Sequence, residues 1–134
     1  MIPWAMNPYY RIYDAVIAVG AGAVATVEVA EDLEVGDIML GAALNVDVAT
    51  TGAGGATKVG IGTAADPDKY GKTAALTLDS KSPGQLFNPT TVLSAAEDLI
   101  LTAVDNDGAA LGTIQNGSVR VRLEYLRMSD LPDA

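Results

Sequence analysis

The chain has 134 residues, enough for one domain with a hydrophobic core, and it contains no cysteine and no histidine. These absences exclude disulfides, thiolate metal sites, cysteine nucleophiles and Ser-His-Asp catalysis. The formal net charge of -9, from 8 basic and 17 acidic residues, disfavours binding to the phosphate backbone of nucleic acid.

Residues 1–14 are predicted to form an extended N-terminal arm. Pro3 and Pro8 favour an extended backbone, and no basic region followed by an apolar run marks a signal peptide. Two interpretations are open: the segment caps the open end of the folded domain, or it reaches onto a neighbouring subunit, where large aromatic side chains supply contact area. On the second interpretation the partner-binding residues are the four aromatic residues of this segment: Trp4, Tyr9, Tyr10 and Tyr13.

Residues 15–128 are predicted to form one β-domain, followed by an acidic C-terminal tail at 129–134. Alternation of apolar and polar residues, with Gly, Pro, Asn and Asp between the runs, predicts many short strands. No run of about 18 apolar residues predicts a membrane-spanning helix. The predicted strands are residues 15–19, 24–29, 37–42, 44–49, 57–61, 74–78, 99–104 and 118–126.

Two of these runs, 44–48 and 57–61, are separated by a glycine-rich stretch and predict a β-hairpin. The last strand is the clearest, because Val119, Val121, Leu123 and Tyr125 fall on one face and charged residues on the other.

A second turn signal, Asn116-Gly117, directly precedes the last strand. With Ser118 it matches a glycosylation sequon, but Asn-Gly before a strand is a strong hairpin signal, so a turn is predicted.

Residues 94–98 have helix-like composition with Ser94 and Glu97 at capping-box spacing, and they predict either one helical turn or a bend before the next strand. The rest of the chain favours strands joined by turns without intervening helices. The predicted fold is therefore all-β, an antiparallel β-sandwich of jelly-roll type, with a partly open barrel as the alternative.

Candidate chemical sites are few. The acidic pairs Asp66 with Asp68 and Asp105 with Asp107 occur in sequences typical of solvated turns. The stretch from Asp105 resembles the start of a calcium loop, but Asn116 stands where the bidentate Glu is required. The glycine-rich stretches lack the Lys-Ser/Thr that follows a phosphate loop. We therefore expect no enzyme activity, no cofactor and no catalytic or metal site, although a cation at Asp105–Gly108 is left open.

The order of segments resembles a class of small virion proteins of tailed bacteriophages. The segments are the alternating strand pair, residues 58–63 leading into 66–70, residues 91–103, and the closing strand 117–125. The resemblance implies a β-sandwich that binds the outside of a capsid as a decoration or cement protein, commonly as a homotrimer.

On this resemblance the expected partners are the major capsid protein and further copies of the chain, with no nucleic acid and no membrane. The expected location is the outer surface of the capsid, with the protein soluble in the host cytoplasm before assembly. The N-terminal arm is expected to anchor it to the capsid or to a neighbouring protomer.

Two rival functions remain open. A receptor-binding or glycan-binding module of a tail or fibre predicts an exposed aromatic residue beside acidic groups, and Tyr70 near Asp66 and Asp68 is the local candidate. A head-completion or tail-assembly protein is the other, and it predicts a ring bound at a single vertex.

Overall fold

The computed structural model describes residues 10–78, 82–83 and 92–130, and its regular structure is almost entirely β-strand. Among these residues no helix has the length and hydropathy needed to cross a bilayer. The elements are β1 (Tyr10–Ala18), β2 (Thr26–Leu33), β3 (Ile38–Val48), β4 (Thr51–Ala53), β5 (Lys58–Gly62), β6 (Gly71–Lys72), β7 (Ser82–Pro83), β8 (Glu97–Val104), β9 (Thr113–Gln115), β10 (Ser118–Leu126) and a 3₁₀ turn, η2 (Met128–Asp130).

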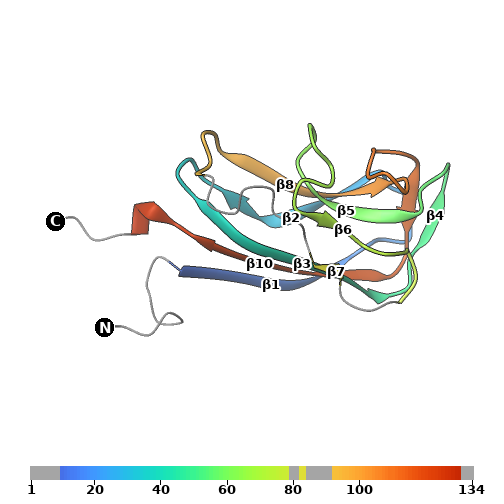
Figure 1. The fold of residues 1–134 in the computed structure, drawn as a ribbon. Helices are drawn as coiled ribbons and strands as arrows, with labels where there is room; N and C mark the ends of the chain where they lie inside the picture. The colour runs from blue at the N-terminus through green and yellow to red at the C-terminus, as the bar shows by residue number, and fades with distance from the viewer. Residues whose placement is uncertain (1–9, 79–81, 84–91, 131–134) are drawn as a thin grey trace.

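Two four-stranded antiparallel sheets form the molecule. The first has the order β1-β10-β3-β7, the second has the order β2-β8-β5-β6, and a small ribbon pairs β4 with β9. Figure 1 shows the two sheets stacked as layers, with β4 at one end and η2 at the other. Successive long strands alternate between the sheets, which is the strand order of a jelly roll. The predicted antiparallel sandwich is confirmed.

The predicted hairpin is wrong. Residues 44–48 form the end of β3, which pairs with β10, whereas β5 pairs with β8 in the opposite sheet. The glycine-rich stretch between them contains β4, which pairs with β9. Alternation identifies the buried face of a strand but not its partner, and in a jelly roll neighbouring strands in sequence cross to the other sheet.

Other strand boundaries also differ from the prediction. The runs 37–42 and 44–49 are one strand, β3, with a register irregularity opposite Glu124 and Tyr125. Residues 74–78 are not a strand, and residues 94–96 do not form a helical turn, because the chain bends there before β8 begins at Glu97.

The first strand begins at Tyr10, so residues 10–14 of the predicted arm belong to the sandwich. All nine residues of β1 pair in continuous register with β10. The rest of the predicted arm, residues 1–9, lies outside the described residues.

Asn116 and Gly117 form a turn, as predicted, but not a hairpin. Both have positive φ, 63° and 76°. They join β9 to β10, which belong to different sheets, and the N–H of Val19 donates to the Gly117 carbonyl at 3.0 Å. The turn therefore carries the chain from the ribbon into the first sheet.

The core lies between the two sheets. On β10 the four predicted core residues, Val119, Val121, Leu123 and Tyr125, are fully buried. They face side chains of β8 and β5 such as Leu101 and Ile61, which are also fully buried. Burying each of these side chains stabilises the fold by roughly 1.5–3 kcal/mol, so the stacking of the sheets depends on this strip.

Two glycines on the outer face of β5 let a loop cover the second sheet. A Cβ on Gly60 would lie 2.7 Å from the Pro67 carbonyl oxygen. A Cβ on Gly62 would overlap the Asp66 carbonyl oxygen and come within 2.8 Å of the Lys69 nitrogen. Gly60 and Gly62 therefore serve close backbone packing.

We predict that Gly62→Ala destabilises the protein by about 1–3 kcal/mol, because backbone atoms of the covering loop must move. Gly20→Ala is the matched control, since a Cβ there meets nothing within 4 Å, and its effect should stay within about 0.5 kcal/mol. Denaturant unfolding measures both. Equal effects at the two positions would contradict the packing described here.

A buried ion pair joins the sheets at the end near η2. We call Arg127, Asp37 and Glu34 the end clamp. Arg127 Nη2 and Nε donate to Asp37 Oδ2 and Oδ1 at 2.9 and 3.2 Å, and Nη2 also donates to the Asp32 carbonyl of β2 at 3.1 Å. The side chains of Arg127 and Asp37 are 10% and 1% exposed. The hydrogen bonds to Asp37 raise the pKa of Arg127, so the guanidinium stays charged.

Replacing Arg127 with Met should destabilise the protein by about 3–5 kcal/mol, because Asp37 would remain buried without its counter-ion. Arg120→Met makes the same chemical change at an exposed ion pair with Asp14 and should cost less than about 1 kcal/mol. Comparable losses in the free energy of unfolding for the two variants would contradict a structural role for the end clamp.

Candidate functional site

Charged side chains line up on the outer face of the first sheet. Antiparallel register places Asp14 of β1 beside Arg122 of β10 and Arg122 beside Ala43 of β3. One row further along, Val16 lies beside Arg120. Because every second residue of a strand points outward, these side chains share the solvent face.

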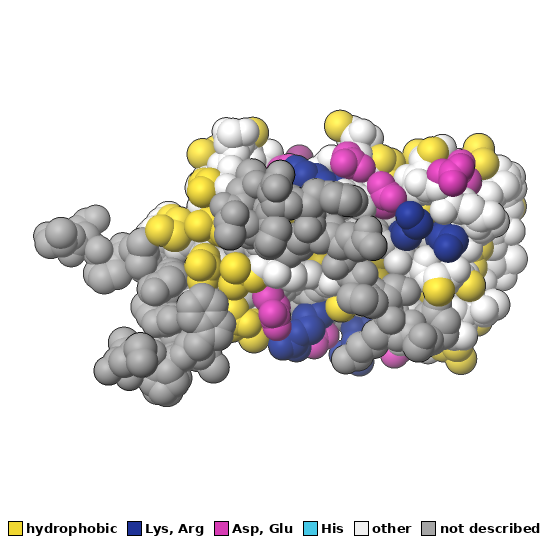
Figure 2. All heavy atoms as spheres, in the orientation of Figure 1, with side chains coloured by type: hydrophobic (Ala, Val, Ile, Leu, Met, Phe, Trp, Pro, Cys, Tyr) yellow, Lys and Arg dark blue, Asp and Glu magenta, His cyan; other side chains and the backbone are white. Residues whose placement is uncertain are grey.

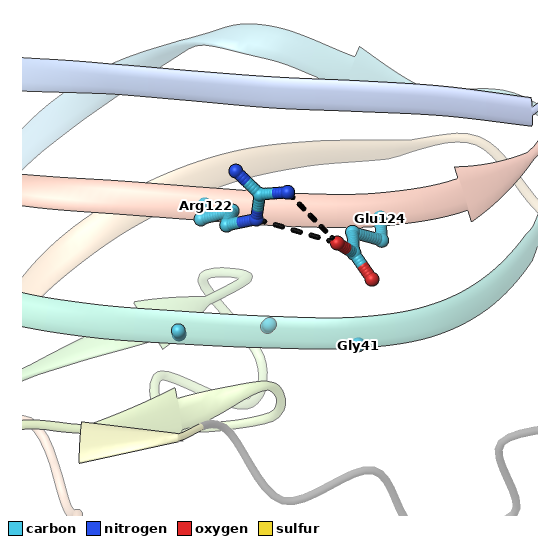
Figure 3. A pocket seen from close by; sticks show the side chains of 5 residues that line it. Gly41, Arg122 and Glu124 are labelled. Atoms are coloured by element: carbon cyan, nitrogen blue, oxygen red, sulfur yellow. Dashed lines mark hydrogen bonds and ion pairs between the residues drawn. The ribbon is translucent and has the colours of Figure 1, made fainter. Parts of the chain in front are cut away.

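Asp14 is the centre of an ion-pair network on this face. Its two carboxylate oxygens accept from Arg120 Nη1 and Arg122 Nη1, each at 3.2 Å. Arg122 also donates from Nη2 to Glu124 Oε1 at 3.1 Å, as Figure 3 shows. Hydrogen bonds to Glu124 and Asp14 raise the pKa of Arg122. Both arginines are therefore neutralised by carboxylates of their own sheet.

Small residues of β3 leave a hollow beside this network. Gly41, Ala42 and Ala43 form its floor, and Arg122 with Glu124 form one wall. Figure 3 shows these two side chains extending from β10 beside the bare backbone at Gly41. The exposed apolar side chains Ile12 and Val16 of β1 lie on the same sheet face. The arrangement offers a surface for contact with another protein.

A second candidate surface lies at the end of the sandwich near η2. We call Val35, Ile38, Val92, Leu126 and Met128 the end patch. Val35, Val92 and Met128 are 65%, 52% and 40% exposed. Ile38 pairs with Leu126 on one side and bridges to Val92 on the other. The turns beside Val35 and Val92 exchange backbone hydrogen bonds of 2.8 and 2.9 Å.

The end patch is therefore an exposed apolar surface on a rigid frame. Figure 2 shows hydrophobic side chains gathered at this end of the molecule. Arg127 of the end clamp lies between Leu126 and Met128 in the chain. No sequence pattern predicts this patch, because its residues come from three separate segments.

The structure describes two of the four predicted partner-binding residues. Tyr13 is half-buried and packs against the core, and Tyr10 is half-buried at the start of β1, opposite Leu126. Trp4 and Tyr9 lie outside the described residues. A partner-binding role for these aromatic residues stays a prediction, and Tyr13 contributes to the sandwich itself.

Tyr70 does not provide an exposed aromatic surface. It is buried, and its hydroxyl donates to Glu97, which also pairs with Lys69. Burial, followed by the bond to Glu97, strongly raises the pKa of Tyr70. The residue proposed for stacking on a glycan therefore fastens the loop that covers β5.

Asp66, which lies close to Asp68 in the loop before Tyr70, has a shifted pKa. Burial, and then a hydrogen bond with Asp68, raise the pKa of Asp66 from its ordinary value of 3.8. Because the folded-state pKa is raised, the stabilising contribution of this group is greatest below pH 3.8 and is lost as the pH rises. Partial desolvation of the Asp66 carboxyl is the largest cause of the shift, and the neighbouring Asp68 adds to it.

The Asp105 carboxylate is occupied by backbone groups. Its Oδ1 accepts from the N–H of Asp107 at 2.9 Å and of Ala109 at 3.0 Å. Gly108 follows with φ of 89°. This is the hydrogen bonding of an acidic turn, as the turn interpretation predicted. Within the described part of the chain, no group of three or more acidic side chains is placed to hold a metal ion.

Comparison with solved structures identifies a likeness of fold. No protein-family model and no curated protein matches the chain. The fold is similar to that of a chain in the solved structure "Cyanophage Pam1 capsid asymmetric unit", with a TM-score of 0.55 and 20% sequence identity. The similarity covers 94% of this chain and 90% of that chain. At this identity the likeness shows a shared fold over nearly the whole of both chains.

Proposed function

We propose that this protein is a non-enzymatic structural component of a bacteriophage virion that binds the outside of the capsid and stabilises it, as a decoration or cement protein does. The observation that carries the proposal is the fold shared with a chain of a cyanophage capsid asymmetric unit, over almost the full length of both chains. A match over nearly the whole of both chains favours a similar role more strongly than a match limited to one shared module would.

The surfaces of the sandwich support this function. A capsid-binding protein needs area for contact with several protein neighbours rather than a deep pocket. The outer face of the first sheet combines exposed apolar side chains with arginines, and arginine is enriched at protein interfaces. The end patch adds an apolar area of the kind that marks interaction sites.

The charge supports a position outside the capsid shell. A formal charge of -9 repels the packaged nucleic acid, so the outer surface suits this chain better than the lumen. The proposed partners are the major capsid protein and further copies of the chain, arranged as a homotrimer. Before assembly the protein is proposed to be soluble in the host cytoplasm.

The N-terminal segment is the proposed anchor. Since β1 begins at Tyr10, the segment that can be removed without cutting the sandwich is residues 1–9, which contain Trp4 and Tyr9. Tyr10 and Tyr13 should be retained because they belong to β1.

We predict that deleting residues 2–9 lowers the affinity for empty capsid shells at least tenfold and leaves the circular dichroism spectrum unchanged. Co-sedimentation of the purified protein with shells of the phage that encodes it measures this affinity. Removing residues 131–134 from the other terminus is the matched control and should leave binding unchanged.

The outcomes separate the two parts of the proposal. If the full-length chain does not sediment with the shells, the capsid-binding function is wrong. If the chain lacking residues 2–9 binds as tightly as the full-length chain, the function stands and the anchor is wrong.

A further inference from the structure

We infer that β1 accepts an added β-strand from the capsid partner, an extended segment with basic side chains that pairs with residues 12–18 along the free edge of the first sheet. The inference rests on the proposed function in one respect, namely that the partner is a capsid protein. It assigns the contact to one strand of the sandwich and to a segment of stated chemistry.

The outer edge of β1 is unpaired. β1 is the terminal strand in the order β1-β10-β3-β7, and all nine of its residues pair on one side with β10. Within the part of the chain that the structure describes, no strand or bridge pairs with its other side. In an antiparallel ladder every second residue directs its N–H and C=O away from the paired neighbour. Residues 12–18 therefore present backbone donors and acceptors to another chain.

The other three edges of the two large sheets have features that discourage pairing with another chain. β6 and β7 have two residues each, and very short edge strands offer little to pair with. β2 carries three acidic residues, and its pairing with β8 is interrupted between Glu28 and Asp32. β1 has no such protection, because its register is continuous and Asp14 is the one charged residue in 12–18. Edge strands without these features are sites for strand addition.

The side chains of β1 are apolar on both faces. Ile12 and Val16 on the outer face are 48% and 45% exposed. On the inner face Tyr13 and Ile17 are only half-buried, whereas the inward residues of neighbouring β10 are fully buried. Apolar residues on both faces are typical of strands that are covered on both faces. An added strand would cover Ile12 and Val16 on one face and Tyr13 and Ile17 on the other.

The edge of the second sheet on the same side of the sandwich is acidic. β6 contacts β3 and β7, so these edges share one side and β1 and β2 share the other. β2 carries Glu28, Glu31 and Asp32 and no basic residue. Packed sheets lie about 10 Å apart, close to the distance over which charges interact at about 0.1 M salt. Basic side chains on a strand added to β1 would therefore be attracted to β2.

Charge disfavours a second copy of the chain as the source of the added strand. Each copy carries a net charge of -9. Pairing of two β1 strands would bring together the two β2 edges beside them, each with three carboxylates. These like charges repel each other, whereas a segment with Lys or Arg would balance them.

Amide hydrogen exchange at residues 12–18 of the full-length protein tests the inference. One probe is a short peptide of alternating Lys and Val, blocked at both ends, and its counterpart has Glu in place of every Lys. We predict that the Lys peptide at saturation slows exchange of the outward amides at least about tenfold, because they become hydrogen-bonded. The Glu peptide should slow it less than about twofold, because β2 repels it.

Equal slowing by the two peptides, or no slowing by either, would overturn the inference. So would slow exchange of all amides in 12–18 in the protein alone, because the edge would then already be covered within the chain or by a second copy.

A charged residue on the edge supplies a second test. Val16→Lys should weaken binding of the Lys peptide at least about tenfold, because it removes an apolar contact and repels the peptide. Val48→Lys is the matched control, since Val48 is 54% exposed and lies in β3. Equal binding by the two variants would contradict pairing along β1.

Empty capsid shells separate this inference from the proposed function. Slower exchange at 12–18 in shell-bound protein would support the capsid as the source of the strand. Shell binding that leaves this exchange unchanged would overturn the inference and leave the capsid function standing. Protection by the Lys peptide in a protein that does not bind shells would reject the capsid function and retain β1 as a docking edge for basic segments.

Discussion

The buried ion pair between Arg127 and Asp37 is the constraint on which the η2 end of this molecule depends. It connects the end of β10 to the turn between β2 and β3, and through the Asp32 carbonyl it reaches the second sheet. Jelly-roll strands pair with partners far away in sequence, so few local contacts hold an open end together. The buried ion pair of Arg127 and Asp37 supplies that connection. Its two hydrogen bonds fix the orientation of both side chains.

Two exposed surfaces lie on the sandwich, the end patch and the outer face of the first sheet. At the same end, Val35, Val92 and Met128 form an exposed apolar patch. Along the sheet, the small residues of β3 expose backbone beside the arginines of β10, whose charges are already balanced by Asp14 and Glu124. Such surfaces suit contact with another protein better than a reaction on a small molecule.

The sequence predicted strand faces well and strand partners poorly. The burial of Val119, Val121, Leu123 and Tyr125 is predictable because a two-residue period determines which face of a strand is buried. The same period does not determine which strands pair, so it predicts a hairpin of β3 and β5, which lie in opposite sheets. In β1 both faces carry apolar residues, and only Asp14 marks the outer one. The burial of Tyr70 could not be foreseen, because its partner Glu97 is 27 residues away. The end patch is likewise assembled from separate segments.

Cryo-electron microscopy of the virion, or of capsid shells assembled with this protein, tests the central claim most directly. The account predicts density for the sandwich in many copies on the outer surface, grouped as trimers. Density confined to a single vertex or to the tail, or no density on the shell, would contradict it.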